Sequence, residues 1–88
     1  MITHETIISE RVSEILQEYL GSDVIFSAES DLLNDLGMDS LEQVELGLKL
    51  EKDFRIKIPV ANLRGCVTVG EVIELVQSVV SQKETRDA

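Results

Sequence analysis

The chain has 88 residues, of which 17 are acidic and 8 are basic, so its formal net charge is −9. A surface this acidic repels nucleic acids and anionic membranes, which excludes both as expected partners and favours basic proteins. Hydrophobic residues make up 43% of the chain, enough for one compact domain with an aliphatic core. We therefore expect one domain over residues 1–88, with its core at about residues 5–80.

No apolar run approaches the ~20 residues that span a bilayer, and the N-terminus lacks the basic-then-apolar order of a signal peptide. We therefore expect a soluble monomer of the cytoplasm, with no membrane insertion. The single cysteine, Cys66, excludes an internal disulfide. We interpret it as a small buried apolar side chain rather than a reactive thiol.

Apolar residues recur three or four positions apart over residues 5–20, which predicts an amphipathic helix. Thr3 or Thr6 could cap its start, and Gly21 is suited to end it. Residues 21–39 show no sustained period and predict a long loop that contains one short helical turn. Four apolar side chains are expected to anchor this loop on the core: Phe26, Leu32, Leu33 and Leu36.

A break at Gly37 precedes a second helix, which is expected to begin at Asp39 or Ser40 and to run to about residue 54. An every-fourth-residue stripe predicts its core face: Leu46, Leu50 and Phe54. After an extended exit, residues 61–64 can form at most one helical turn.

Thr68 and Glu71 match a capping box, so the last main helix is expected to begin there. Five apolar residues predict its inward face: Val69, Val72, Ile73, Val76 and Val80. Residues 83–88 are polar and are expected to fray. The predicted fold class is all-α, a small antiparallel helical bundle with three main helices, one short helix and a long loop between the first two helices.

The second helix carries one apolar stripe more than a core requires. Leu41, Val44 and Leu48 lie nearly opposite the core stripe on a helical wheel, so part of this second stripe should stay exposed and available for contact. No Lys or Arg occurs over residues 12–48, and negative charge concentrates around the start of the second helix in seven of the carboxylates of that interval: Asp23, Glu29, Asp31, Asp35, Asp39, Glu42 and Glu45. Their field could steer a basic partner, or it could only keep the protein soluble.

Residues 35–41 read DLGMDSL and resemble the D-L-G-x-D-S-L segment that carries the modified serine of acyl carrier proteins. Later landmarks of that family follow at matching spacing: Val44-Glu45-Leu46, Glu51 to Phe54, Ile58-Pro59 and Thr68-Val69. The resemblance therefore covers about residues 5–80.

This resemblance implies a carrier protein and not an enzyme. A phosphopantetheinyl transferase would move 4'-phosphopantetheine from coenzyme A onto the hydroxyl of Ser40, which is also expected to cap the second helix, with Asp39 and Leu41 flanking it. The arm would present acyl groups as thioesters to fatty-acid, polyketide or related biosynthetic enzymes. Acyl-transfer and chain-elongation enzymes with basic patches would dock on six residues: Asp35, Met38, Glu42, Val44, Glu45 and Leu48.

Several residues depart from the common fatty-acid carrier pattern. Gly47 replaces a bulkier apolar residue, which either leaves space for a cargo chain or a partner backbone or only softens the helix. Arg55, Lys57 and Arg64 are basic where the common bacterial carriers are acidic. These differences indicate a specialised carrier for a polyketide, lipid or secondary-metabolite pathway.

Three other functions compete with that of a carrier for this sequence. A calcium loop over residues 31–42 fails because Leu33 and Leu36 occupy a ligand position and the glycine position, so no metal is expected. A serine hydrolase is disfavoured because no His or Cys lies near Ser40 in sequence. A helical adaptor that binds partners without modification of Ser40 remains open.

Overall fold

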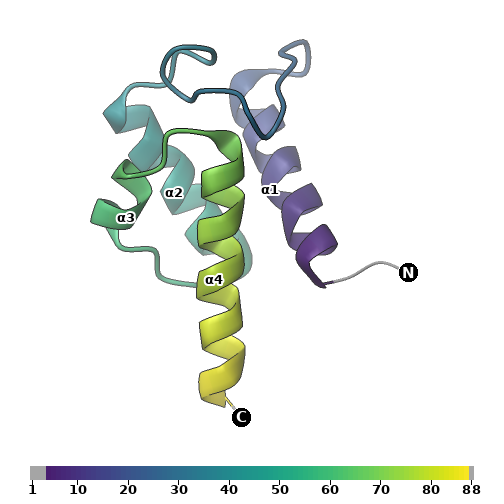
Figure 1. Cartoon of the computed structure of the whole chain (residues 1–88), viewed down its shortest axis with the longest axis vertical. Helices are drawn as coiled ribbons and strands as arrows, with labels where there is room; N and C mark the ends of the chain where they lie inside the picture. The colour runs from purple at the N-terminus through teal and green to yellow at the C-terminus, as the bar shows by residue number, and fades with distance from the viewer. Residues whose placement is uncertain (1–3, 88) are drawn as a thin grey trace.

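The structure is a computed structural model that describes residues 4–87. Its four helices are α1 (His4–Leu20), α2 (Ser40–Phe54), α3 (Val60–Arg64) and α4 (Val69–Asp87). Figure 1 shows α1 running opposite to α2 and α4, with the long loop between α1 and α2 crossing one end of the bundle. Helix α1 packs on both α2 and α4, and α3 packs on the same two helices. This arrangement confirms the predicted all-α bundle.

The C-terminus of α1 ends at a glycine, as predicted. Gly21 has a φ of 113°, which side chains disfavour, and its N–H donates to the Gln17 carbonyl at 2.8 Å. The Gln17 amide then donates to the carbonyls of Gly21 and Val24 at 2.6 and 2.7 Å, so the chain leaves the helix in a fixed direction. At the other end, Thr6 lies inside α1 and is not its cap, and Thr3 lies outside the described residues.

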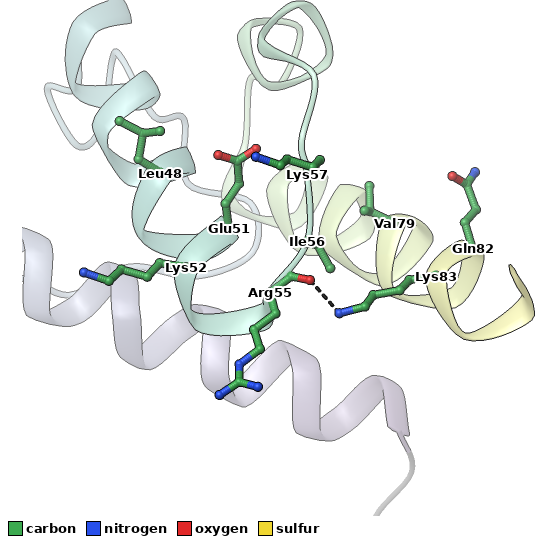
Figure 2. Close-up of a pocket in the computed structure, with 9 residues that line it drawn as sticks. All are labelled: Leu48, Glu51, Lys52, Arg55, Ile56, Lys57, Val79, Gln82 and Lys83. Atoms are coloured by element: carbon green, nitrogen blue, oxygen red, sulfur yellow. Dashed lines mark hydrogen bonds between the residues drawn. The ribbon is translucent and has the colours of Figure 1, made fainter. Parts of the chain in front are cut away.

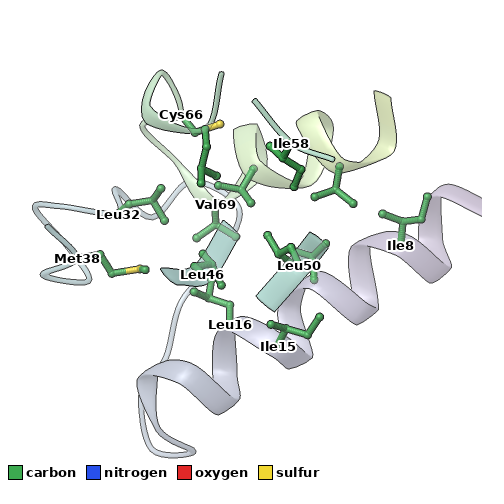
Figure 3. Packing of buried hydrophobic residues seen from close by; sticks show 14 of the residues in the cluster. Ile8, Ile15, Leu16, Leu32, Met38, Leu46, Leu50, Ile58, Cys66 and Val69 are labelled. Carbon is green, nitrogen blue, oxygen red and sulfur yellow. The ribbon is translucent and has the colours of Figure 1, made fainter. Parts of the chain in front are cut away.

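The core is one aliphatic cluster to which all four helices and the long loop contribute (Figure 3). Leu46 and Leu50 of α2 are fully buried in it, and Phe54 is partly buried against it, which confirms the predicted core stripe. Each fully buried leucine contributes about 1.5–3 kcal/mol to folding. Helix α4 buries Val69, Val72 and Val76 and packs Ile73 and Val80 at the margin, again as predicted.

Three of the four expected anchors hold the long loop. Leu32 is buried, and Phe26 and Leu36 pack against the core. Leu33 is 59% exposed, so its assignment as an anchor is wrong. The two leucines are adjacent in a turn, and only one of them can point inward.

Backbone hydrogen bonds join the long loop to the connection between α3 and α4. The Leu32 N–H donates to the Val67 carbonyl at 2.8 Å, and the Val69 N–H donates to the Ser30 carbonyl at 3.1 Å. The loop is therefore fixed both by side-chain burial and by its own peptide groups. This matters because the loop leads directly into the start of α2.

Helix α4 begins at the predicted capping box. The Glu71 carboxylate accepts from the N–H groups of Val67 and Thr68 at 2.7 and 3.0 Å, and the Thr68 hydroxyl accepts from the Glu71 N–H at 3.2 Å. These bonds hold the pKa of Glu71 below its usual value.

At its other end, α4 continues through Asp87 and so includes residues 83–87 of the tail that is expected to fray. The Lys83 ammonium donates to the Arg55 carbonyl at 2.6 Å, which ties this part of α4 to the end of α2. Within residues 4–87, no helix is both long and apolar enough to cross a membrane.

Candidate functional site

The start of α2 is closed by a capping box in which Asp39 is the N-cap. The Asp39 carboxylate accepts from the Glu42 N–H at 2.9 Å, and the Glu42 carboxylate accepts from the Asp39 N–H at 3.2 Å. Asp39 has the extended backbone typical of this position, with φ −81° and ψ 179°. The expectation that Ser40 caps the helix is therefore wrong. The side chain that accepts the hydrogen bond from the Glu42 N–H is that of Asp39.

Ser40 is the first residue of α2, and its side chain is exposed. Among the described residues its hydroxyl makes no hydrogen bond, and the N–H groups of Ser40 and Leu41 have no acceptor there either. Unpaired amides and the positive end of the helix dipole favour an attached anion. The geometry thus fits a phosphate ester on the Ser40 oxygen, which could form without the loss of any internal bond.

The turn before α2 is held by carboxylates and one glycine. The Asp31 carboxylate accepts from the N–H groups of Leu33 and Asn34 at 2.9 and 2.8 Å. The hydrogen bond from the Asn34 N–H is the main cause that lowers the pKa of Asp31, and the bond from Leu33 adds to it. The Asp35 carboxylate accepts from the Asp31 N–H at 2.7 Å, and Gly37 takes a φ of 68° to break the turn.

Met38 is not a surface residue. Its side chain is only 1% exposed, and its N–H donates to the Leu32 carbonyl at 2.8 Å, which draws the segment inward. Its assignment to the docking surface is therefore wrong. Its apolar thioether side chain instead packs in the core cluster two residues before Ser40.

The second apolar stripe of α2 is exposed, as predicted. Leu41 is 68% and Leu48 is 61% exposed, and Val44 between them is half-buried. The structure therefore leaves an apolar band on α2 that begins next to Ser40. Such bands usually mark a contact with another molecule.

The three predicted docking carboxylates, and Asp39 with them, lie around this band and the helix start. Asp35, Asp39 and Glu45 are exposed, and Glu42 is half-buried. The structure brings them to one end of the bundle, since all four belong to α2 or to the turn that leads into it.

Sequence reasoning missed the contact that positions Glu45. The Tyr19 hydroxyl of α1 donates to the Glu45 carboxylate at 2.8 Å, and this bond raises the pKa of Tyr19 to about 12. The Lys49 ammonium lies 6.0 Å from the centre of the Tyr19 ring. The apolar period of α1 indicates no partner for Tyr19, because this contact joins residues that lie 26 positions apart in the sequence.

The structure explains why residue 47 is a glycine, and the explanation excludes both space for a cargo chain and space for a partner backbone. A Cβ atom at this position would overlap the Cδ2 atom of Leu63, which is buried in α3. The space beside the glycine is thus filled by α3. It is not left open for cargo or for a partner backbone.

Cys66 is buried, as predicted, and its thiol lies 3.6 Å from the Asn62 carbonyl, to which it donates. Burial is the main cause that raises the pKa of the Cys66 thiol, and the charges of Glu71 and Glu74 add to it. A buried thiol with a raised pKa is poorly reactive. Cys66 therefore contributes to packing and not to the chemistry of the site.

Comparison with known proteins agrees with this geometry. Residues 10–76 match the family model described as "Phosphopantetheine attachment site". An acyl carrier protein of Saccharopolyspora erythraea is 40% identical over 82 residues, which cover 92% of this chain and 86% of that protein. The match includes the long loop, α2 and the start of α4. The chain therefore belongs to the acyl carrier protein family: it is a carrier and not a catalyst, its covalent prosthetic group is phosphopantetheine, and it interacts with a phosphopantetheinyl transferase and with acyl-handling enzymes.

Proposed function

We propose that the phosphopantetheine arm is attached to the hydroxyl of Ser40 and that this chain presents thioester-bound acyl groups from that position. The observation that carries the proposal is the exposed Ser40 hydroxyl, which makes no hydrogen bond among the described residues. It lies at the first turn of α2, within the DLGMDSL segment. A transferase can therefore reach this oxygen without unfolding the helix.

The chain's own residues fix the arm's point of attachment. The capping box of Asp39 and Glu42 keeps the first turn of α2 helical. The free N–H groups of Ser40 and Leu41 offset part of the repulsion between a phosphodiester and the nearby carboxylates. When bound, the arm supplies a terminal thiol that holds acyl groups as thioesters.

We place the docking surface on the exposed band of α2, Leu41, Val44 and Leu48, with three carboxylates beside it, Asp35, Glu42 and Glu45. The band supplies apolar area, and the carboxylates complement a basic patch on a partner. Support comes from the exposure of both leucines and from the position of the band directly after Ser40. Met38 is left out of this surface because it is buried.

We also propose that this carrier serves a specialised pathway, for a polyketide, a lipid or a secondary metabolite, rather than common fatty-acid synthesis. The support is the positive charge of Arg55, Lys57 and Arg64, all of which are exposed. We place it in the cytoplasm as a monomer, where coenzyme A supplies the arm. Mass spectrometry of the protein from its native cell would identify the cargo directly.

Intact-mass measurement after incubation with coenzyme A and a broad-specificity phosphopantetheinyl transferase tests the attachment site. The wild-type chain should gain the mass of one phosphopantetheine, and Ser40→Ala should gain none. Ser78→Ala is the matched control, because Ser78 is also an exposed helical serine but lies on α4. It should load as the wild type does.

An unchanged mass of the wild-type chain, with a second carrier loaded in the same reaction as a positive control, would contradict the proposal. That result would favour the adaptor function instead. Full loading of Ser40→Ala would show that another residue carries the arm.

A further inference from the structure

An open hollow lies at the end of α2 that is remote from Ser40. It is bordered by the last turns of α2, by the extended connection to α3 and by α4 (Figure 2). At a helical rise of about 1.5 Å per residue, the end of α2 lies roughly 22 Å from Ser40. The far part of the hollow is therefore distant from the attachment site, whereas Leu48 on its near side lies about 12 Å from Ser40 along the helix.

The rim of this hollow is basic in a protein that is otherwise acidic. Four of the chain's eight basic residues line it: Lys52, Arg55, Lys57 and Lys83. Glu51 is the one carboxylate among the lining residues, and it already accepts a hydrogen bond from the Ile58 N–H at 2.6 Å. Positive charge therefore predominates here although the whole chain carries −9.

The rest of the lining includes apolar side chains. Leu48, Ile56 and Val79 contribute to it, and Leu48 is 61% exposed. Leu48 also belongs to the exposed band of α2, so the band continues into the hollow. A ligand that binds in this hollow must present apolar groups to its floor and negative charges to its basic rim.

The connection that forms one side of the hollow is held in a defined conformation. Arg55 takes the left-handed conformation with a φ of 56°, which glycine adopts far more easily than a residue with a Cβ atom. The Lys83 ammonium secures it by donating to the Arg55 carbonyl at 2.6 Å, as Figure 2 shows. The cations of Arg55 and Lys57 thus project from a fixed stretch of chain, and both side chains are exposed.

We propose that this hollow is a second docking surface, which shares Leu48 with the first and binds an acidic amphipathic segment of a partner protein while Ser40 itself stays uncovered. Carboxylates on the segment would pair with the rim, and its apolar side chains would cover the floor. A membrane surface is a poorer occupant because the net charge of −9 opposes its approach to anionic lipid. This interaction does not require the arm, so it can be tested separately from the proposed attachment site.

The test is a titration of the isotope-labelled full-length chain, followed by nuclear magnetic resonance. The probe is a synthetic helical peptide with a leucine stripe flanked by glutamates, and a peptide with lysines in place of the glutamates is its counterpart. The glutamate peptide should saturably shift the amide signals of Lys57 and Val79. Added salt should weaken its binding, and the lysine peptide should not bind at the hollow.

Two single charge reversals make the test specific. Lys57→Glu should weaken binding roughly tenfold, because it places a like charge at the rim. Arg64→Glu is the matched control: it makes the same change in net charge at an exposed residue of α3 that does not line the hollow, and it should have little effect. Lys52→Glu is a second rim variant in case the first folds poorly, which circular dichroism would reveal.

Other results would overturn the proposal. These are equal weakening by Lys57→Glu and Arg64→Glu, shifts centred on the start of α2, or no saturable shift at the hollow. Shifts of the same signals by anionic phospholipid vesicles, without an effect of the peptide, would assign the surface to membranes instead. Shifts that depend on protein concentration alone would assign it to a second copy of this chain. Binding of the peptide by Ser40→Ala should equal that of the wild type, whatever the outcome of the loading experiment.

Discussion

Gly47 sets how closely α3 approaches α2. Its missing side chain is what allows Leu63 to reach the surface of α2 and to be buried there. A glycine in a helix costs about 1 kcal/mol relative to alanine, so the chain gives up helix propensity at this position for packing. From the sequence alone, Gly47 is equally consistent with a residue that only makes the helix locally less stable.

We predict that Gly47→Ala lowers the free energy of unfolding by about 1 kcal/mol, since overpacking costs about 1–3 kcal/mol and propensity returns about 1 kcal/mol. In a Leu63→Ala background the obstruction is gone, and the same change should raise that free energy by up to about 1 kcal/mol. Urea unfolding of the four proteins measures both effects. A stabilising Gly47→Ala in the parent chain would show that Leu63 moves aside at no cost.

At the scale of elements, the two main helices that follow the long loop both begin with a capping box. Asp39 pairs with Glu42 at α2, and Thr68 pairs with Glu71 at α4. The sequence predicts the box of α4 and places the start of α2 at Asp39 or Ser40, because a capping box depends only on residues three positions apart. The assignment of the N-cap of α2 was ambiguous because two adjacent residues, Asp39 and Ser40, can each act as caps.

The cap of α4 predicts a pH dependence. The pKa of Glu71 is lowered by hydrogen bonds from Val67 and Thr68, so its stabilising effect is present above the pKa of an unfolded glutamate and is lost as the pH falls through the lower folded value. Between neutral pH and about pH 4 the wild-type chain should therefore begin to lose stability, and this loss should continue below pH 4. The substituted side chain of Glu71→Gln would keep a hydrogen-bond acceptor but would not titrate. The free energy of unfolding of this variant should therefore fall less steeply than that of the wild type as the pH is lowered.

Unfolding in urea at a series of pH values measures this slope. Glu74→Gln is the control, because Glu74 lies exposed on the same helix and caps nothing. Its slope should exceed that of Glu71→Gln. Equal slopes for the two variants would show that the cap does not depend on the charge of Glu71.

The elements also show where sequence reasoning succeeds and where it fails. Period and caps were sufficient to predict the core stripe of Leu46 and Leu50, because a helix places such residues on one face whatever surrounds it. Met38 and Leu33 were misplaced because the direction of a loop side chain depends on distant hydrogen bonds, such as that from Leu32 to Val67. The tie from Lys83 to Arg55 spans 28 positions, and no local pattern indicates it.

At the scale of the whole molecule, the two ends of α2 differ in charge. Carboxylates surround the end that carries Ser40, and basic side chains surround the hollow at the other end. We therefore expect a basic partner that approaches from solution to be steered toward the Ser40 end rather than attracted equally to all faces. The net charge alone would not have revealed this orientation.

We predict that kcat/KM for loading by a phosphopantetheinyl transferase falls with added salt, because screening weakens this steering. Asp35→Asn should lower kcat/KM by up to about fivefold, the equivalent of about 1 kcal/mol for one exposed ion pair, and should reduce the salt dependence. The asparagine side chain can still accept the hydrogen bond from Asp31, so the turn should persist.

Steady-state loading rates over a range of salt concentrations measure both effects. Glu10→Gln removes the same charge from an exposed position in the first half of α1 and should change little. The next residue, Arg11, bonds to Asp53 at the end of α2 opposite Ser40, so Glu10 lies away from the attachment site. If the two variants lost equal activity, net charge rather than its placement would govern the encounter.

The capping of α2 by Asp39 has a consequence for how the carrier responds to its own modification. Since the side chains of Asp39 and Glu42 cap the helix and that of Ser40 does not, attachment of the arm at the proposed position would break no hydrogen bond of the Ser40 oxygen among the described residues. Bare and loaded forms can therefore share one backbone. Successive enzymes would then bind the same protein surface. Only the acyl group on the terminal thiol of the arm would distinguish one stage of a synthesis from the next.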